Sequence, residues 1–167
     1  EDIDRNGVAD DQYLYKKPAP DVMLGINSQV TYKKWNFGVA FHGSFGNYLY
    51  NNYAAGNGVL NAIKDPQTFI RNASADYLVT RFNNQQYLSD YYIQNASFLR
   101  WDNINIGYNL GNISKTDIRA RLNASIQNVA VFTNYKGLDP ENSRVDGIDN
   151  NIYPRPRIFS LGFNLDF

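Results

Sequence analysis

The chain has 167 residues, a formal net charge of zero, no cysteine and a single histidine. Zero net charge gives no electrostatic case for nucleic-acid binding, and the absence of cysteine excludes disulfides and thiolate metal sites. His42 alone cannot supply a multi-histidine metal site or a histidine pair for catalysis, so no cofactor is expected. No run approaches 18 apolar residues, so no membrane helix is expected either.

The composition fits two classes of protein. A mean hydropathy of −0.49 is what a soluble domain would show. A membrane β-barrel gives a similar average, because its strands alternate lipid-facing and lumen-facing residues. The 13 Tyr and 10 Phe favour the barrel, since aromatic girdles mark both of its membrane interfaces.

Two alternating segments come first, at 23–32 and 35–45, joined by a tight turn at Lys33-Lys34. A period of two predicts β-strands with one apolar and one polar face. The apolar positions are Leu24, Ile26, Val30, Tyr32, Trp35, Phe37, Val39, Phe41 and Phe45. Together the two segments predict a hairpin.

A long stretch from 47 to 95 is rich in Asn, Tyr and Gln and lacks sustained alternation. It is therefore expected to be a long loop. Asp65 before Pro66 favours a short helical turn over 65–73 within it.

Three more strands follow, at 97–110, 118–128 and 157–167. The first of them breaks phase at "FLRWD", which predicts a bulge or a segment above the apolar band. The second alternates Ile118, Ala120, Leu122, Ala124 and Ile126 with Arg119, Arg121, Asn123, Ser125 and Gln127. The connection at 111–117 is short, whereas the one at 129–156 is long.

Connections of alternating length are typical of outer-membrane barrels, which have short periplasmic turns and long extracellular loops. The turn at Lys33-Lys34, the connection 111–117 and Phe167 are therefore expected on the periplasmic side. About ten residues tilted by about 40° cross an apolar band about 25 Å tall, so the strands have the required reach.

Five strands cannot close such a barrel, and each unpaired backbone group at an open edge in lipid costs several kcal/mol. We therefore expect the chain to be part of a larger barrel. Two alternatives remain: a small barrel assembled from several identical chains, and a soluble secreted β-sandwich that binds carbohydrate through its tyrosines.

Three stretches closely resemble the C-terminus of SusC/RagA-type TonB-dependent outer-membrane transporters: "SFLRWDNINIGYNL", "IRARLNASIQNVAVFTNYKGLDPE" and "GIDNNIYPRPRIFSLGFNLDF". The front half is similar more loosely, through "DIDRNGVADDQ" and "PDVMLGINSQVTYKKWNFGVAFHGSFGNYLYN". The resemblance covers nearly the whole chain and is weakest between 54 and 92.

The resemblance implies that residues 1–167 are the last five strands of a 22-stranded antiparallel transmembrane β-barrel. The plug and the TonB-contacting segment would lie upstream, outside this chain. The whole protein would be a nutrient importer in the outer membrane of a Gram-negative bacterium, not an enzyme. It would take up glycans or oligopeptides, pair with a SusD-like surface lipoprotein as a lid, and draw energy from TonB.

Three groups of residues are expected to act in such a transporter. Substrate or lid contact is expected from Tyr87, Tyr91, Tyr92, Phe98, Arg100, Trp101, Tyr135 and Lys136. The lumen-facing group is Arg119, Arg121, Asn123 and Gln127. The last group, Phe159, Leu161, Phe163, Leu165 and Phe167, would face lipid and serve as the signal read by the barrel-assembly machinery. The alternatives are loop packing, a solvated wall with ion pairs, and lipid contact alone.

The front loop carries oxygen ligands of the kind that Ca²⁺ prefers, in Asp4, Asn6, Asp10 and Asp11. An Asx-type turn explains the same residues without a cation. No catalytic group is evident, because His42 is flanked by Phe41 and Gly43 with no nucleophile motif nearby.

Overall fold

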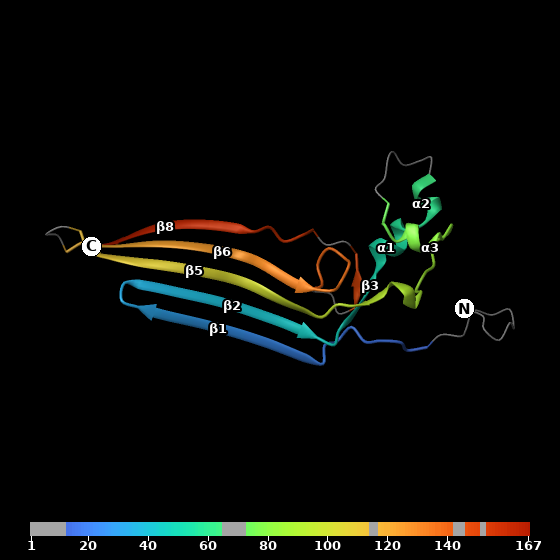
Figure 1. Cartoon of the computed structure of the whole chain (residues 1–167), viewed down its shortest axis with the longest axis horizontal. Helices are drawn as coiled ribbons and strands as arrows, with labels where there is room; N and C mark the ends of the chain where they lie inside the picture. The colour runs from blue at the N-terminus through green and yellow to red at the C-terminus, as the bar shows by residue number, and fades with distance from the viewer. Residues whose placement is uncertain (1–12, 65–72, 114–116, 142–145, 151–152) are drawn as a thin grey trace.

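The computed structural model describes residues 13–64, 73–113, 117–141, 146–150 and 153–167. A long antiparallel sheet forms the body of the molecule, and short strands and helices gather at one end of it (Figure 1). Residues 65–72, which contain most of the expected helical turn, lie outside the described part of the chain.

Five strands make up the long sheet: β1 (Val22–Tyr32), β2 (Trp35–Phe45), β5 (Phe98–Asn112), β6 (Arg119–Thr133) and β8 (Ile158–Asp166). Their order is β1-β2-β5-β6-β8, and every neighbouring pair is antiparallel. Each of these strands therefore pairs with the next one along the chain, as the alternating segments predicted. The strands β1 and β8 form the two margins.

The register carries the alternation across the whole sheet. One row of Cα partners is apolar: Val30, Phe37, Ile106, Ala124 and Leu161. The next row, one residue along, is Thr31, Asn36, Gly107, Asn123 and Gly162. Since successive side chains of a strand point to opposite faces, the sheet has one apolar face and one polar face.

The apolar face is not covered by a second layer among the described residues. Leu161 is 90% exposed and Phe159 is 72% exposed. A β-sandwich would bury such side chains against a facing sheet about 10 Å away. The structure therefore speaks against the sandwich alternative.

Aromatic side chains gather on the apolar face near both ends of the strands. Near the β1–β2 turn, the ring of Trp35 lies 4.6 Å from Tyr108 and 5.9 Å from Phe37, between centroids. Towards the other end, Phe41 stacks on Trp101 at 5.2 Å. This is the arrangement that two aromatic girdles require.

The phase break at "FLRWD" is a bulge, as predicted. Ala40 pairs with Asn103 and Phe41 with Trp101, so Asp102 has no partner on β2. The β5–β6 register shifts at the same level, near Asn128, whose φ is +51°. The extra residue puts Trp101 on the apolar face.

Beyond the bulge, β6 continues to Thr133, past the expected end of the strand at 128. Residues Phe98–Trp101 of β5 pair with this extension. The left-handed backbone at Asn128 accommodates the extra residues of β6 at the bulge. The pairing of β5 with β6 therefore continues beyond the bulge.

Three short strands form a second sheet at the loop end, in the order β4 (Ile93–Asn95), β3 (Tyr48–Asn51) and β7 (Ile148–Asp149). Here β3 pairs antiparallel with β4 and parallel with β7. The sequence predicted only irregular loop in these places. Strands of two to four residues are too short to show a clear period of two.

Short helices complete the loop end: α1 (Asn52–Asn57), α2 (Leu60–Lys64), α3 (Tyr77–Thr80) and the 3₁₀ turn η1 (Asp90–Tyr92). The side chain of Asn51 caps α1, accepting a hydrogen bond of 2.9 Å from the Ala54 amide. In the described residues, none of these helices has the length and apolar content that crossing a bilayer requires.

Candidate functional site: a loop platform over the polar face

A buried arginine on β5 organises the polar face at the loop end. The Arg100 side chain is 4% exposed, and its Nη2 lies 2.5 Å from Asp139 Oδ1. Its Nη1 donates to Asn128 Oδ1 at 2.8 Å, and its Nε lies 2.9 Å from Glu141 Oε2 as an ion pair. A guanidinium removed from water needs such partners, because burying an unpaired charge is costly.

His42 joins the same network from β2, where it pairs with Arg100 across the ladder. Its Nδ1 lies 2.7 Å from Asp102 Oδ2, and its Nε2 lies 3.3 Å from Glu141 Oε2. Phe98 meets the edge of the imidazole at 5.5 Å. A neutral ring can donate to one of the two carboxylates, and an imidazolium to both.

The segment before β8 is held by the same carboxylates. Arg155 Nη1 lies 2.9 Å from Glu141 Oε2, and its Nε lies 3.7 Å from Asp139 Oδ2. Asn128 also donates to the Arg155 carbonyl at 2.6 Å. Two segments of the connection between β6 and β8, around Asp139–Glu141 and around Arg155, are thereby held at one point on the sheet.

Because Arg100 and His42 lie on the polar face, the loop that carries Asp139 and Glu141 lies over that face. We call Tyr135–Glu141 the platform loop. It occupies space on the polar side near the loop end of the sheet, so it would narrow any channel that this face lines.

Tyr135 gives the platform loop a second anchor. It is 6% exposed and packs with Leu49 and Ala96, and its hydroxyl donates to Asp149 Oδ2 at 2.6 Å. Burial, and then the bond to Asp149, raise the pKa of the Tyr135 phenol above its usual value of 10. The phenol therefore stays protonated and keeps donating to the carboxylate.

A second buried tyrosine, Tyr92, holds the helical part of the loop end in place. Tyr92 is fully buried against Ala54 and Ala55, with Tyr50 and Tyr91 at its edges, at ring centroid distances of 6.2 and 5.0 Å. Burial raises the pKa of both Tyr92 and Tyr50. This packing stabilises the position of the loop.

The residues expected to contact substrate or lid do not form one cluster. Exposed side chains belong to Tyr87, Tyr91 and Lys136, whereas buried ones belong to Tyr92, Phe98, Arg100 and Tyr135. Trp101 lies on the apolar face, opposite the platform loop. The structure thus brings Phe98 and Arg100 to the platform as supports and leaves Tyr87 and Tyr91 accessible.

The residues expected to face the lumen all lie on the polar face. Arg121 Nε donates to Asn109 Oδ1 at 2.7 Å, and Asn123 Nδ2 donates to Asn164 Oδ1 at 2.9 Å. Arg119 pairs with Asp166, and Gln127 pairs with Asn103, in the ladders beside them. Cross-strand polar contacts of this kind are what a wetted barrel wall makes.

The residues expected to face lipid in β8 lie on the apolar face, opposite Ile126, Ala124, Leu122 and Ala120. Phe167 follows the strand and is 96% exposed. Their role in assembly stays a prediction.

The candidate Ca²⁺ ligands Asp4, Asn6, Asp10 and Asp11 fall outside the described residues. Within the described ranges, no group of three or more acidic or histidine side chains is placed to hold a metal ion.

Sequence reasoning missed the ion-pair partners of Arg100, Asp139 and Glu141. It also missed the residues that contact the same carboxylates or His42, which are His42, Asp102 and Arg155. The run "YKGLDPE" marked the loop in which two of them lie, but not the side chain that they bind.

No protein-family model matches the chain. The TonB-dependent receptor SusC of Bacteroides thetaiotaomicron is 39% identical over 99% of this chain and 17% of its own length. The TonB-dependent receptor P3 of Formosa agariphila is 30% identical over 99% of this chain and 18% of its own length. The chain therefore spans less than a fifth of the curated relatives it matches.

Solved structures of the RagAB peptide importer share the fold. The open-open state superposes with a TM-score of 0.69 at 22% identity, over 91% of this chain and 18% of the matched one. The closed-closed state gives 0.66 at 24%, over 92% and 18%. Sequence and fold thus both match the chain to one segment of the TonB-dependent transporters of the outer membrane. The similarity is to transporters of the SusC/RagA type, as the sequence predicted.

Proposed function

We propose that this segment forms wall and loops of a TonB-dependent nutrient importer in the outer membrane of a Gram-negative bacterium. The observation that carries the proposal is the two-faced sheet: no described residue covers its apolar rows, and its polar face holds a charged network. Lipid on one side and water on the other satisfy both faces. The segment would supply the last five strands of a 22-stranded barrel, with plug and TonB-contacting segment upstream.

Import, not catalysis, is the activity that this architecture supports. The polar face would line the interior, and the platform loop would lie near its extracellular mouth. A SusD-like lipoprotein would close over that mouth, and TonB would supply energy through the upstream part. Exposed tyrosines such as Tyr87 and Tyr91 could stack on sugar rings or peptide groups.

Glycans and oligopeptides are both retained as cargo classes. Similarity to SusC supports a transporter of this type, and the matched RagAB structures are described as a peptide importer. The strand ending in Phe167 would also be recognised by the barrel-assembly machinery. Recognition by that machinery would depend on the alternation of apolar and polar residues in β8, and not only on the position of β8 in the barrel wall.

The test is uptake by the whole transporter in its host, together with the SusD-like lipoprotein proposed as its partner. Cells are given fluorescently labelled oligosaccharide and oligopeptide mixtures, and internalised label is measured. Deleting the transporter should abolish uptake of one class and spare the other. A strain without TonB should show the same loss, because energy coupling is then missing.

Uptake that is unchanged in the deletion strain would contradict the proposal. So would recovery of the whole protein in the aqueous fraction without detergent, since that would favour the sandwich. A symmetric homo-oligomer of chains no longer than this one, seen by native mass spectrometry in detergent, would favour the small shared barrel.

A further inference from the structure

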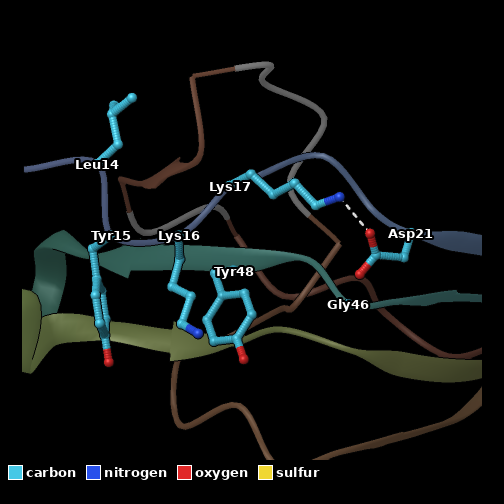
Figure 2. A pocket seen from close by; sticks show the side chains of 7 residues that line it. All are labelled: Leu14, Tyr15, Lys16, Lys17, Asp21, Gly46 and Tyr48. Atoms are coloured by element: carbon cyan, nitrogen blue, oxygen red, sulfur yellow. Dashed lines mark hydrogen bonds and ion pairs between the residues drawn. The ribbon is translucent and has the colours of Figure 1, made fainter.

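A pocket of about 560 Å³ opens where the chain enters β1, at the loop end of the sheet (Figure 2). Its walls are Leu14, Tyr15, Lys16, Lys17, Asp21, Gly46 and Tyr48. None of these residues belongs to the ion-pair network around Arg100, which we call the platform network. None was among the substrate-contacting, lumen-facing or lipid-facing residues that the sequence predicted either. The pocket is large enough for one or two units of a sugar or peptide chain.

Two neighbouring lysines of the pocket differ in their partners. Lys17 forms an ion pair with Asp21. The Nζ atom of Lys16 instead lies 5.3 Å from the ring centroid of Tyr15 and 5.1 Å from that of Tyr48. Cation–π contacts orient an ammonium without neutralising it. Lys16 has no carboxylate partner among the described residues, so within this part of the chain its positive charge is not compensated.

Three polar ends lie side by side in this pocket. Figure 2 shows the hydroxyls of Tyr15 and Tyr48 and the ammonium of Lys16 pointing to the same side. Neither hydroxyl has a hydrogen-bond partner in the part of the chain that the structure describes. Two phenols and one ammonium together are a set of donors suited to an anionic group.

The backbone holds the pocket walls in place. The Tyr48 amide donates to the Lys17 carbonyl at 3.1 Å, and the Asp21 amide donates to the Phe45 carbonyl at 2.8 Å. Gly46 has a φ of +84°, and a Cβ there would lie 2.2 Å from Asp21 Oδ2. The close approach that places Asp21 beside Lys17 therefore requires glycine at this position.

We propose that this pocket is a subsite for a carboxylate group of the transported oligomer. Lys16 binds the carboxylate, and the half-exposed ring of Tyr15 packs against the C–H face of the adjoining sugar ring or side chain. The subsite rests on the proposed import function, because it requires cargo that passes the loop end. Uronic acids and acidic side chains of peptides share this chemistry.

The test measures binding to the purified whole transporter with its lipoprotein, by calorimetry in detergent. The sugar probes are tri-galacturonic acid and its methyl ester. The peptide probes are a pentapeptide with two glutamates and the same peptide with two glutamines. At least one acidic probe should bind the wild type more tightly than its neutral counterpart, and which one does so identifies the cargo class.

Lys16→Gln should weaken binding of that acidic probe about fivefold and leave the neutral probe unchanged, as expected for a partly exposed ion pair. Tyr48→Leu should weaken it as well. Lys33→Gln is the matched control, because Lys33 also lies over a tyrosine ring, 5.3 Å from Tyr32, but at the opposite end of the sheet. It should have no effect.

Several results would overturn the subsite. One is equal binding of the acidic and neutral probes by the wild type. Another is an unchanged affinity in Lys16→Gln. A third is tighter binding of the acidic probe by Asp10→Asn, Asp11→Asn, since the chain's own acidic front segment would then be the occupant. If uptake by cells persists in these cases, the subsite fails and import stands; if uptake is absent, import itself fails.

Discussion

Arg100 and Asp139 form a buried ion pair, 2.5 Å between Nη2 and Oδ1, with side chains 4% and 8% exposed. The pair joins the loop end of the central strand β5 to a loop 39 residues further along the chain. A pair so removed from water cannot lose one partner without leaving the other charge unbalanced.

Arg100→Met should therefore release the platform loop. The loss of a buried pair's partner costs about 3–5 kcal/mol, and Arg155 at 3.7 Å from Asp139 can offset part of that. Hydrogen exchange of the whole transporter should show lost protection over residues 135–141. Arg121→Met, which removes an exposed arginine from the same face, should leave this protection unchanged. Equal exchange in both variants would contradict the anchoring role.

Arginine substitutions at two neighbouring residues of β8 test which face of the sheet contacts lipid. Leu161→Arg places a charge on the apolar face, where lipid contact would make it cost about 2–4 kcal/mol at mid-bilayer depth. Ser160→Arg places the same charge one residue earlier, on the polar face. We expect poor recovery of folded Leu161→Arg transporter from outer membranes and near-normal recovery of Ser160→Arg. The reverse order would mean that the faces are assigned wrongly.

Tyr135→Phe should lower stability near neutral pH by about 1–3 kcal/mol, because Asp149 loses a buried donor. Hydrogen exchange at the contact measures this change.

The same variant should respond differently to alkali. The folded pKa of Tyr135 is raised above 10, so its contribution is complete below pH 10 and is lost as pH rises further. At pH 11 the wild type should lose about 1.4 kcal/mol that the phenylalanine variant does not lose. Comparing the hydrogen exchange of the wild type and the phenylalanine variant at pH 8 and pH 11 isolates the loss of stability that is due to ionisation of Tyr135. Parallel losses would show that Tyr135 ionises normally.

Asn128 combines a left-handed backbone with hydrogen bonds to Arg100 and Arg155. Asn128→Gly removes the bonds but tolerates the φ of +51°, whereas Asn128→Val removes the bonds and adds strain. We expect the valine variant to be less stable than the glycine variant by about 1–2 kcal/mol, measured by thermal unfolding in detergent. Equal midpoints would show that the bulge relaxes without cost.

The long strands could be predicted because apolar and polar residues alternate along each of them, according to the face on which each side chain lies. A period of two that persists for nine residues or more, as in β8, has no common explanation other than a two-faced strand. The bulge near Asp102 was visible for the same reason, as a break in that period.

The platform network could not be predicted in this way. Arg100 contacts Asn128 on the neighbouring strand, 28 residues away, and Asp139 in a loop without any period, 39 residues away. The bulge also changed which aromatic residue shares a face with Ile104 and Ile106: Trp101 lies on that apolar face, and Phe98 lies on the polar face. Polar contacts between distant loops leave no local pattern, so their partners emerge only when the chain is folded.

The ladder order has a consequence for how such a transporter could diversify. Ser44, before the first long excursion, and Phe98, after it, are register partners on adjoining strands. The more than fifty residues between them leave and rejoin the scaffold at one place, so an exchanged excursion would not shift the pairing. The segment between Ser44 and Phe98 can therefore change in sequence and length during evolution while the pairing of the long strands stays the same.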